Sequence, residues 1–229
     1  MPAPLPDPRV AVVIPALNEA GTIERVIRAL PAVHAVIVAD NGSTDDTAAR
    51  AQAAGATVVA VPRRGYGSAC REGIAAGIAG GADVIVILDA DLADDPSELP
   101  RLLAPIRAGA ADLVLSERTR LAQPGALLPH QRFGNGLATL LIGWSTGARF
   151  RDMGPFRAIR VDALQRLDMQ DPTWGWNVEM ALKAVRHGLV WVEVPMSYRV
   201  REGVSKISGT VRGSVRAGGR ILWAVWRYR

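Results

Sequence analysis

Two carboxylates separated by one residue, Asp89 and Asp91, directly follow a short apolar run and form the strongest chemical feature of the chain. Carboxylates at this spacing beyond the end of a strand can share one hard divalent cation, which completes its shell with water and phosphate oxygens. A cation held there can neutralise the charge that builds on a departing diphosphate. The pattern is common by chance, so a solvated acidic loop is the alternative interpretation.

Two further acidic residues follow apolar runs. Asp40 precedes a turn at 41–43, where its carboxylate can accept hydrogen bonds from a nucleobase or a ribose hydroxyl. An Asx turn that caps the next helix is the competing interpretation. Glu19 follows the first apolar run by five residues and can do the same work, or it can stabilise the N-terminus of its own helix.

The glycines Gly65 and Gly67 suggest a dinucleotide-binding turn, but their spacing does not fit one. The next glycine is Gly73 and the segment does not follow the first strand, so the Gly-x-Gly-x-x-Gly pattern fails. A hydride-transfer enzyme is therefore disfavoured. The local amides and Arg63 or Arg64 remain candidates for contact with a phosphate.

Strands and helices must alternate to bring these residues to one edge. Apolar spacing predicts a first helix from Ile23 to Leu30, and Ser43 or Asp45 can cap a second helix that ends at Gly55. Repeated βαβ units predict a Rossmann-like α/β domain, whose ligands bind beyond the carboxyl ends of the strands. The predicted strands are Val10–Ile14, Ala35–Ala39, Thr57–Val61, Val84–Leu88 and Leu113–Leu115.

The second half of the chain is less regular. We expect a helix over Asn135–Ile142, a turn at Gly154 and Pro155, and a strand over Val190–Val194. With 229 residues, the chain is long enough for one sizeable core and too short for two independent domains.

Composition narrows the choice of partner and compartment. The formal net charge of +5 falls mostly in the last third and favours an anionic partner. Only 5% of residues are aromatic and no helix-turn-helix, zinc-ligand or RNP-like pattern occurs, which argues against nucleic acid and favours an anionic lipid or a phosphorylated substrate.

The single cysteine, Cys70, excludes an internal disulfide and is typical of a reducing cytosol. Neither a signal peptide nor a spanning apolar run is found, so we expect a cytoplasmic protein that is soluble or peripheral on a membrane.

Four segments together resemble the family 2 glycosyltransferases of the GT-A fold, and within them the polyprenyl-phosphate (dolichyl-phosphate) mannosyl- and glucosyltransferases. The resemblance implies a GT-A-like domain over residues 10–209 with a mixed, mostly parallel sheet flanked by helices. A flexible N-terminus, residues 1–9, would precede it, and an amphipathic helix, residues 210–229, would follow it. The segments are Val12 to Glu19 (VVIPALNE), Ile37 to Asp45 (IVADNGSTD), Leu88 to Asp91 (LDAD) and Arg201 to Ile207 (REGVSKI).

The resemblance assigns donor and metal residues. Asp89 and Asp91 would bind Mg²⁺ or Mn²⁺ and, through it, the diphosphate of a nucleotide sugar. The residues implied to contact the nucleotide sugar are Pro15, Leu17, Glu19, Asp40 and Asp89.

Two positions depart from the family pattern. Asn41 stands where the family often has Asp, and Ala93 stands where mannosyl members often have Gln, which removes a third metal ligand. Asp94, Asp95 or water would have to compensate.

The acceptor implied by the resemblance is a phosphate, which needs cations in forked geometry. Asp152 matches the carboxylate of the family's D-x-x-GFR segment. An ionised phosphate needs no base, so Asp152 would shape the site, or would be the base if the acceptor were a hydroxyl. The implied acceptor cations are Arg118, Arg132, Arg199, Arg201 and Lys206, and the implied catalytic residues are Asp89, Asp91, Asp152, Arg118 and Arg132.

Two regions have both a functional and a structural interpretation. Trp174, Trp176 and Glu179 would lie near the acceptor end of the site, although tryptophan is more often a core residue. In the C-terminal helix, four arginines fall within an arc of roughly 80° beside an apolar face, as in a helix that lies on a membrane, or one that docks on the domain. These arginines are Arg212, Arg216, Arg220 and Arg227.

The sequence therefore predicts an inverting glycosyltransferase that moves a hexose from a nucleotide sugar, of the UDP-glucose or GDP-mannose type, to a polyprenyl phosphate at the inner face of a membrane. A transferase that acts on a soluble or glycan hydroxyl is the first alternative. A nucleotide-sugar-binding module without turnover is the second.

Overall fold

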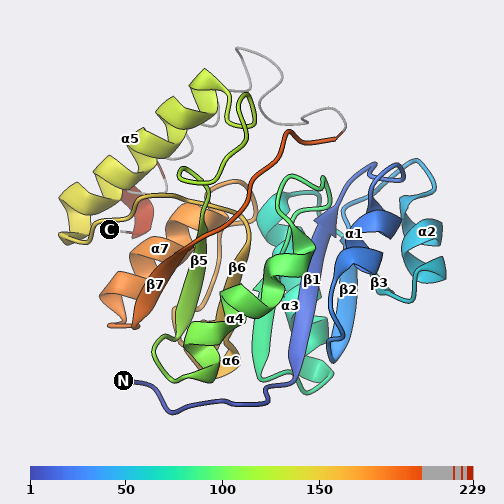
Figure 1. Cartoon of the computed structure of the whole chain (residues 1–229), viewed down its shortest axis with the longest axis horizontal. Coiled ribbons are helices and arrows are strands. Elements are labelled where there is room, and N and C mark those ends of the chain that lie inside the picture. The colour runs from blue at the N-terminus through green and yellow to red at the C-terminus, as the bar shows by residue number, and fades with distance from the viewer. Residues whose placement is uncertain (203–218, 220–222, 224–225, 229) are drawn as a thin grey trace.

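The central element of the structure is a mixed sheet. Its strands are β1 (Val10–Ala16), β2 (Ala35–Asp40), β3 (Thr57–Ala60), β4 (Val84–Ile87), β5 (Leu113–Glu117), β6 (Arg157–Arg160) and β7 (Trp191–Pro195). They lie in the order β3-β2-β1-β4-β6-β5-β7 (Figure 1). All neighbouring strands pair in parallel except β6, which runs antiparallel to both β4 and β5. The predicted mixed, mostly parallel sheet is confirmed.

Helices cover both faces of this sheet (Figure 1). This computed structural model describes residues 1–202, together with residues 219, 223 and 226–228. Within this part the helices are α1 (Ile23–Ala29), α2 (Thr47–Ala53), α3 (Tyr66–Ala79), a 3₁₀ turn η1 (Pro96–Glu98), α4 (Leu99–Arg107), α5 (Pro129–Thr146), α6 (Val161–Leu167) and α7 (Trp176–Arg186). No helix in these described ranges is long and apolar enough to cross a membrane.

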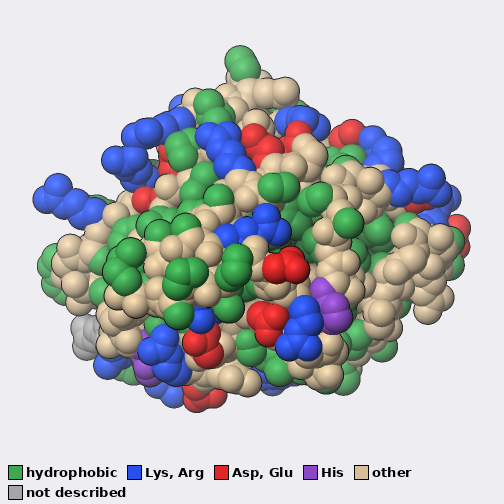
Figure 2. Space-filling view, turned by 60° about the horizontal axis from the view of Figure 1, so that its bottom comes forward, with side chains coloured by type: hydrophobic (Ala, Val, Ile, Leu, Met, Phe, Trp, Pro, Cys, Tyr) green, Lys and Arg blue, Asp and Glu red, His purple; other side chains and the backbone are tan. Residues whose placement is uncertain are grey.

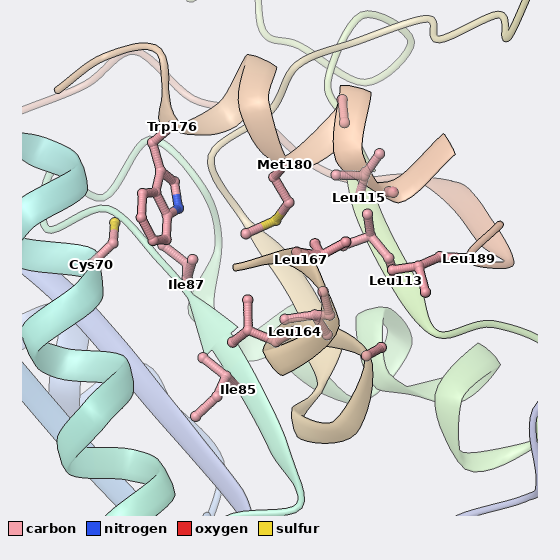
Figure 3. Packing of buried hydrophobic residues seen from close by; sticks show 14 of the residues in the cluster. Cys70, Ile85, Ile87, Leu113, Leu115, Leu164, Leu167, Trp176, Met180 and Leu189 are labelled. Carbon is pink, nitrogen blue, oxygen red and sulfur yellow. The ribbon is translucent and has the colours of Figure 1, made fainter. Parts of the chain in front are cut away.

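The apolar strands are buried on both faces, as their near-continuous hydrophobic runs predict. Successive residues alternate between two clusters. Val13, Ile85 and Ile87 face the side of α3, α6 and α7, where Leu164, Trp176 and Met180 pack on them (Figure 3). Val12, Val86 and Leu88 face the other side, against α1 and α4.

Some boundaries differ from the prediction. Strand β6 has only four residues, two of them arginines, so its sequence carries no apolar run that would reveal it. Helix α5 spans 129–146 rather than 135–142, since Pro129 takes its first position and Gly147, with φ of 75°, ends it. At α2 the N-cap position is Asp46, whose side chain makes no capping hydrogen bond; the predicted candidate Asp45 lies one residue earlier, and its Oδ1 accepts a hydrogen bond from the Thr47 amide at 3.0 Å.

Little of the predicted C-terminal helix lies among the described residues. Residues 219, 223 and 226–228 are helical, and Tyr228 is buried against α7, where its carbonyl accepts a hydrogen bond from Arg186 at 3.0 Å. Trp226 is exposed. Arg212, Arg216 and Arg220 lie outside the described residues.

The glycines before and within α3 make room for a distant backbone segment. A Cβ atom at Gly65 would lie 2.1 Å from the Pro172 carbonyl oxygen, and one at Gly67 would lie 1.9 Å from the Asp171 carbonyl oxygen. The Ser68 amide donates to the same Pro172 carbonyl at 3.1 Å. Contact with the 171–172 segment, and not dinucleotide binding, therefore explains this pair of glycines.

We expect Gly67→Ala to destabilise the fold by about 1–3 kcal/mol, because overpacking against a backbone carbonyl outweighs the higher helix propensity of alanine. Urea denaturation followed by circular dichroism measures the loss. Gly21→Ala is the control, since its Cβ would meet no atom within 4 Å, and it should be nearly neutral. Equal stability of the two variants would contradict this account of the α3 glycines.

Candidate active site

A cavity of about 570 Å³ opens beyond the carboxyl ends of β1, β2 and β4, where ligands of such sheets bind. Four loops from the first half of the chain, those after β1, β2, β3 and β4, and two later segments form its wall. The lining residues are Pro15, Ala16, Leu17, Glu19, Asn41, Arg64, Gly65, Tyr66, Asp89, Ala90, Asp91, Thr173, Trp174 and Arg201. The predicted donor residues Pro15, Leu17, Glu19 and Asp89 are thus brought together, as is Asp91.

Asp89 and Asp91 lie directly after β4 on the floor of this cavity. Tyr66 donates its hydroxyl hydrogen bond to Asp89 Oδ1 at 3.2 Å. Asp91 Oδ1 accepts a hydrogen bond from the Ala93 amide at 3.0 Å, across Leu92, whose φ of 59° is unusual for a bulky residue. A tight turn in a strained conformation therefore fixes the Asp91 carboxylate.

Burial and the negative charge of Asp91 raise the pKa of Asp89 to about 7. The Tyr66 hydrogen bond and the charge of Arg201 act in the opposite direction. Two carboxylates at this spacing repel each other, and the repulsion falls when a cation is shared between them.

These carboxylates suit a hard divalent cation. Among the described residues no group of three His, Cys, Asp or Glu side chains could hold a metal ion, so Asp89 and Asp91 would leave the remaining positions to water and diphosphate oxygens. Neither proposed substitute for the missing third ligand is placed to act as one. Asp95 caps η1 by accepting from the Ser97 amide at 3.1 Å and pairs with Arg199. Asp94 is buried away from the cavity wall, and burial raises its pKa well above the ordinary value.

Arg201 is held against the carboxylate pair by its own backbone segment. Its Nη2 lies 3.1 Å from Asp91 Oδ2, and the next amide, that of Glu202, donates to the Asp91 carbonyl at 3.0 Å. Arg25 then pairs with the Glu202 carboxylate. The guanidinium of Arg201 therefore provides part of the positive charge that a metal would also provide.

The loops after β1 and β2 are joined by side-chain hydrogen bonds. The Asn18 amide donates to Ser43 Oγ at 2.9 Å, and Asn18 Oδ1 accepts from the Thr44 amide at 2.8 Å. The Glu19 amide donates to Thr47 Oγ1 at 2.8 Å. These bonds set the shape of the wall formed by residues 15–19.

Asn41 lies in the cavity wall and Asp40 does not, although the motif suggested Asp40 as the residue that contacts the nucleotide sugar. Asp40 Oδ1 accepts from the Ser43 amide, three residues further on, at 3.2 Å, so its carboxylate stabilises the local turn, and Asp40 is not part of the cavity wall. Asn41 lines the cavity and its Oδ1 accepts from the Gly65 amide at 2.9 Å. Asn41 thereby connects the β2 loop to the loop that presents Tyr66.

Glu179 does not line the cavity; its side chain holds a segment of the cavity wall in place. It is fully buried, accepts hydrogen bonds from the Gln170 and Asp171 amides at 2.8 and 2.7 Å, and pairs with Lys183. These contacts fix the 170–174 segment, so that Trp174 faces the cavity while Trp176 is buried in the core. The core interpretation was correct for Trp176.

Asp152 and Arg118 form a buried ion pair near the cavity. Asp152 is fully buried, and its two oxygens accept from Arg118 Nε at 2.8 Å, Arg118 Nη2 at 2.7 Å and the Arg118 amide at 2.8 Å. Burial lowers the pKa of Arg118, but the hydrogen bonds and charge of Asp152 outweigh it and raise that pKa overall. The Arg118 guanidinium also lies over the Tyr198 ring at 4.9 Å.

Two side chains that the motifs did not reveal hold the Asp152 segment in place. Glu193 on β7 accepts from the Arg151 and Asp152 amides at 2.8 and 2.9 Å. Asn135 on α5 accepts from the Met153 amide at 2.8 Å. Glu193 is the one charged residue of the apolar strand β7, and that exception to the pattern is the signal the sequence offers for it. Asn135 lies among other polar residues of α5, so the sequence does not single it out.

The predicted acceptor cations are not gathered in one place. Arg201 lines the cavity, Arg118 is bound to Asp152, and Arg199 is paired with Asp95. Arg132 is exposed on α5. Lys206 lies outside the described residues.

The sequence model described as glycosyl transferase family 2 matches residues 11–168. The chain belongs to this family. Three proteins illustrate how similar this family 2 enzyme is to known glycosyltransferases. An uncharacterised glycosyltransferase of Mycobacterium tuberculosis is 38% identical, covering 91% of this chain and 94% of the relative. A polyprenol monophosphomannose synthase of Mycolicibacterium smegmatis is 33% identical, covering 90% of this chain and 83% of the relative. An undecaprenyl-phosphate mannosyltransferase of Micrococcus luteus is 32% identical, covering 90% of this chain and 90% of the relative.

A solved structure agrees with the same assignment. The glucosyl-3-phosphoglycerate synthase of Mycobacterium tuberculosis, crystallised with Mn²⁺, UDP-glucose and phosphoglyceric acid, superposes with a TM-score of 0.76 and 28% identity, covering 96% of this chain and 80% of the other. The predicted GT-A-like fold and the prediction of an enzyme are confirmed. This family 2 chain is a nucleotide-sugar-dependent glycosyltransferase.

The raised pKa of Asp89 makes metal binding depend on pH. Metal binds the ionised carboxylate, so protons should compete below pH 7, and Mn²⁺ affinity should fall by up to about tenfold per pH unit there. Calorimetry at pH 6 in two buffers of different ionisation enthalpy should detect proton release on binding. Asp89→Asn should abolish that release, and its persistence in this variant would show that another group titrates.

Arg201→Ala should change metal and nucleotide binding in opposite directions. Without the guanidinium on Asp91, Mn²⁺ alone should bind about three- to tenfold more tightly. The nucleoside diphosphate should bind more weakly at saturating Mn²⁺, since a cation facing its phosphates is lost. Arg25→Ala, which removes only an exposed pair, should change neither affinity. A loss of both affinities in Arg201→Ala would mean that Arg201 supports the loop and does not compete with the metal.

Proposed function

We propose that this glycosyltransferase moves one hexose from a UDP- or GDP-sugar to the phosphate of a polyprenyl phosphate, with inversion, at the cytosolic face of a membrane. Residues Pro15, Leu17 and Glu19 would contact the nucleoside. Asp89 and Asp91 would hold Mg²⁺ or Mn²⁺, whose chemistry is to neutralise charge on the departing nucleoside diphosphate.

In the proposed reaction, a phosphate oxygen of the acceptor attacks the anomeric carbon from the side opposite the nucleotide. A carbon–oxygen bond to the acceptor forms as the bond to the diphosphate breaks, and the configuration inverts. Arg201, in the cavity wall, is placed to balance negative charge on phosphate groups, and Arg64 lines the same cavity.

The occupied carboxylate of Asp152 is the observation that favours a phosphate acceptor. A hydroxyl acceptor needs a base, and Asp152 is the residue that the family pattern offers, but both of its oxygens are hydrogen-bonded to Arg118. A phosphate acceptor is already ionised at pH 7. The relatives named for polyprenyl and undecaprenyl phosphate mannose transfer support the same acceptor class.

Transfer to a hydroxyl of a small phosphorylated acceptor is the second candidate. The likeness to glucosyl-3-phosphoglycerate synthase favours it. Such an acceptor would use the same cations for its phosphate and would need Asp152 to leave Arg118 and accept a proton.

The test is transfer from radiolabelled UDP-glucose and GDP-mannose, with Mn²⁺, to a short-chain polyprenyl phosphate or to phosphoglycerate. We expect an organic-soluble, acid-labile product with the polyprenyl phosphate. A labelled product formed only with phosphoglycerate would overturn the proposed acceptor and favour the second candidate.

Asp91→Asn should reduce this transfer more than tenfold, a barrier increase above about 1.4 kcal/mol, because the metal and the departing diphosphate lose a carboxylate. Asp95→Asn is the matched control, since Asp95 lies outside the cavity wall and should leave the rate nearly unchanged. Circular dichroism verifies that both variants fold. Retention of more than about a tenth of the wild-type rate in Asp91→Asn at saturating Mn²⁺ would contradict the metal role.

A further inference from the structure

Helix α5 has an apolar face that the rest of the described structure does not cover. Phe133, Leu140 and Trp144 are 73%, 68% and 79% exposed, and Leu137 between them is partly exposed. At about 100° per residue these four side chains fall within an arc of roughly 60°. Ile142 points the opposite way and is fully buried. Figure 1 shows α5 along the outer edge of the molecule.

The charged residues in the segment that contains α5 have one sign. From Arg118 to Arg151 the sequence contains five arginines and no Asp or Glu. Arg118 and Arg120 pair with Asp152 and Glu117, whereas three exposed arginines make no ion pair within the described part of the chain. These three are Arg132, Arg149 and Arg151.

The pattern differs from that of an ordinary solvated surface. On the face seen in Figure 2, acidic and basic side chains are interspersed. An exposed apolar stripe in a segment whose exposed, unpaired charges are all arginines instead matches a surface that inserts shallowly into a bilayer and contacts lipid phosphates.

We infer that α5 is the membrane-docking surface of this enzyme and that its partner is an anionic lipid bilayer. The inference rests on the proposed lipid-linked acceptor and specifies the face that reaches it. Phe133, Leu140 and Trp144 enter the boundary between headgroups and acyl chains, and the three arginines contact headgroup phosphates. A second copy of the chain fits less well, because a self-complementary contact would bring these unpaired arginines close to their own copies.

Asn135 connects this surface to the reaction site. It lies on α5 between Arg132 and Leu137, and its side chain accepts from the Met153 amide at 2.8 Å and donates to the Arg151 carbonyl at 3.4 Å. Asp152 lies between those two residues and holds Arg118. A docked α5 therefore places the Arg118–Asp152 pair at a fixed distance from the lipid surface.

The experiment compares full-length wild type with the triple variant Phe133→Ser, Leu140→Ser, Trp144→Ser. Co-sedimentation with vesicles of phosphatidylcholine and phosphatidylglycerol, at low and moderate salt, measures binding. The triple variant should bind at least about tenfold more weakly, since three exposed apolar side chains no longer enter the bilayer.

The double variant Arg149→Gln, Arg151→Gln should lose about tenfold in affinity for anionic vesicles and little in affinity for vesicles of phosphatidylcholine alone. Val200→Ser, which alters an exposed apolar residue outside both α5 and the C-terminal helix, is the control and should bind like wild type.

Further measurements distinguish loss of membrane docking from misfolding and from self-association. The triple variant should keep its circular dichroism spectrum and its affinity for a nucleoside diphosphate with Mn²⁺, because its altered residues lie outside the cavity wall. Equal vesicle binding by wild type and triple variant, or absence of binding by wild type, would overturn the inference. So would a wild-type dimer in light scattering that becomes a monomer in the triple variant, since a second copy would then be the occupant. Vesicle binding through α5 without transfer to any lipid phosphate would instead refute the proposed acceptor and leave the docking surface standing.

Discussion

The electrostatic repulsion between Asp89 and Asp91 is the constraint to which the rest of the site responds. Both carboxylates are placed at the end of a fully buried strand, and burial together with their proximity raises the pKa of Asp89. The Tyr66 hydroxyl and the Arg201 guanidinium each offset part of this cost. A divalent cation and a diphosphate would complete the balance, so the arrangement is most favourable when the donor is bound.

A second set of buried polar contacts organises the other half of the site. Asp152 is matched by Arg118, and the amides that flank Asp152 are bonded to Glu193 and Asn135. Buried polar groups with complete partners define one geometry, while partly satisfied ones are costly. The same principle explains Glu179, which contacts no ligand-facing space and yet determines where Trp174 lies.

The sequence was most informative where function and local pattern coincide. The apolar runs of β1, β2 and β4 and the acidic residues that follow them predicted the sheet edge and the Asp89–Asp91 pair, because strand ends of a parallel sheet meet at one edge. It was least informative for β6, whose Arg157 is fully buried without an apolar pattern, and for Tyr66, which reaches Asp89 only through the packing of 171–172 on Gly65 and Gly67. Those contacts join residues far apart in the chain, and no spacing rule encodes them. Asn41 illustrates a third case, since this departure from the family motif keeps an acceptor oxygen for the Gly65 amide.

The order of the strands in the sheet also has a kinetic consequence. Strands β1, β2 and β3 pair with one another through single helical crossovers, whereas β1 pairs with β4 (Val10 opposite Val84), β4 with β6 (Val84 opposite Arg160) and β5 with β7 (Leu113 opposite Trp191). Each of these pairings closes a long loop, and the entropy of that closure is lost before the contacts repay it. Because these pairings are non-local, we expect the sheet around Asp152 and Arg118 to form later in folding than the β1–β2–β3 part.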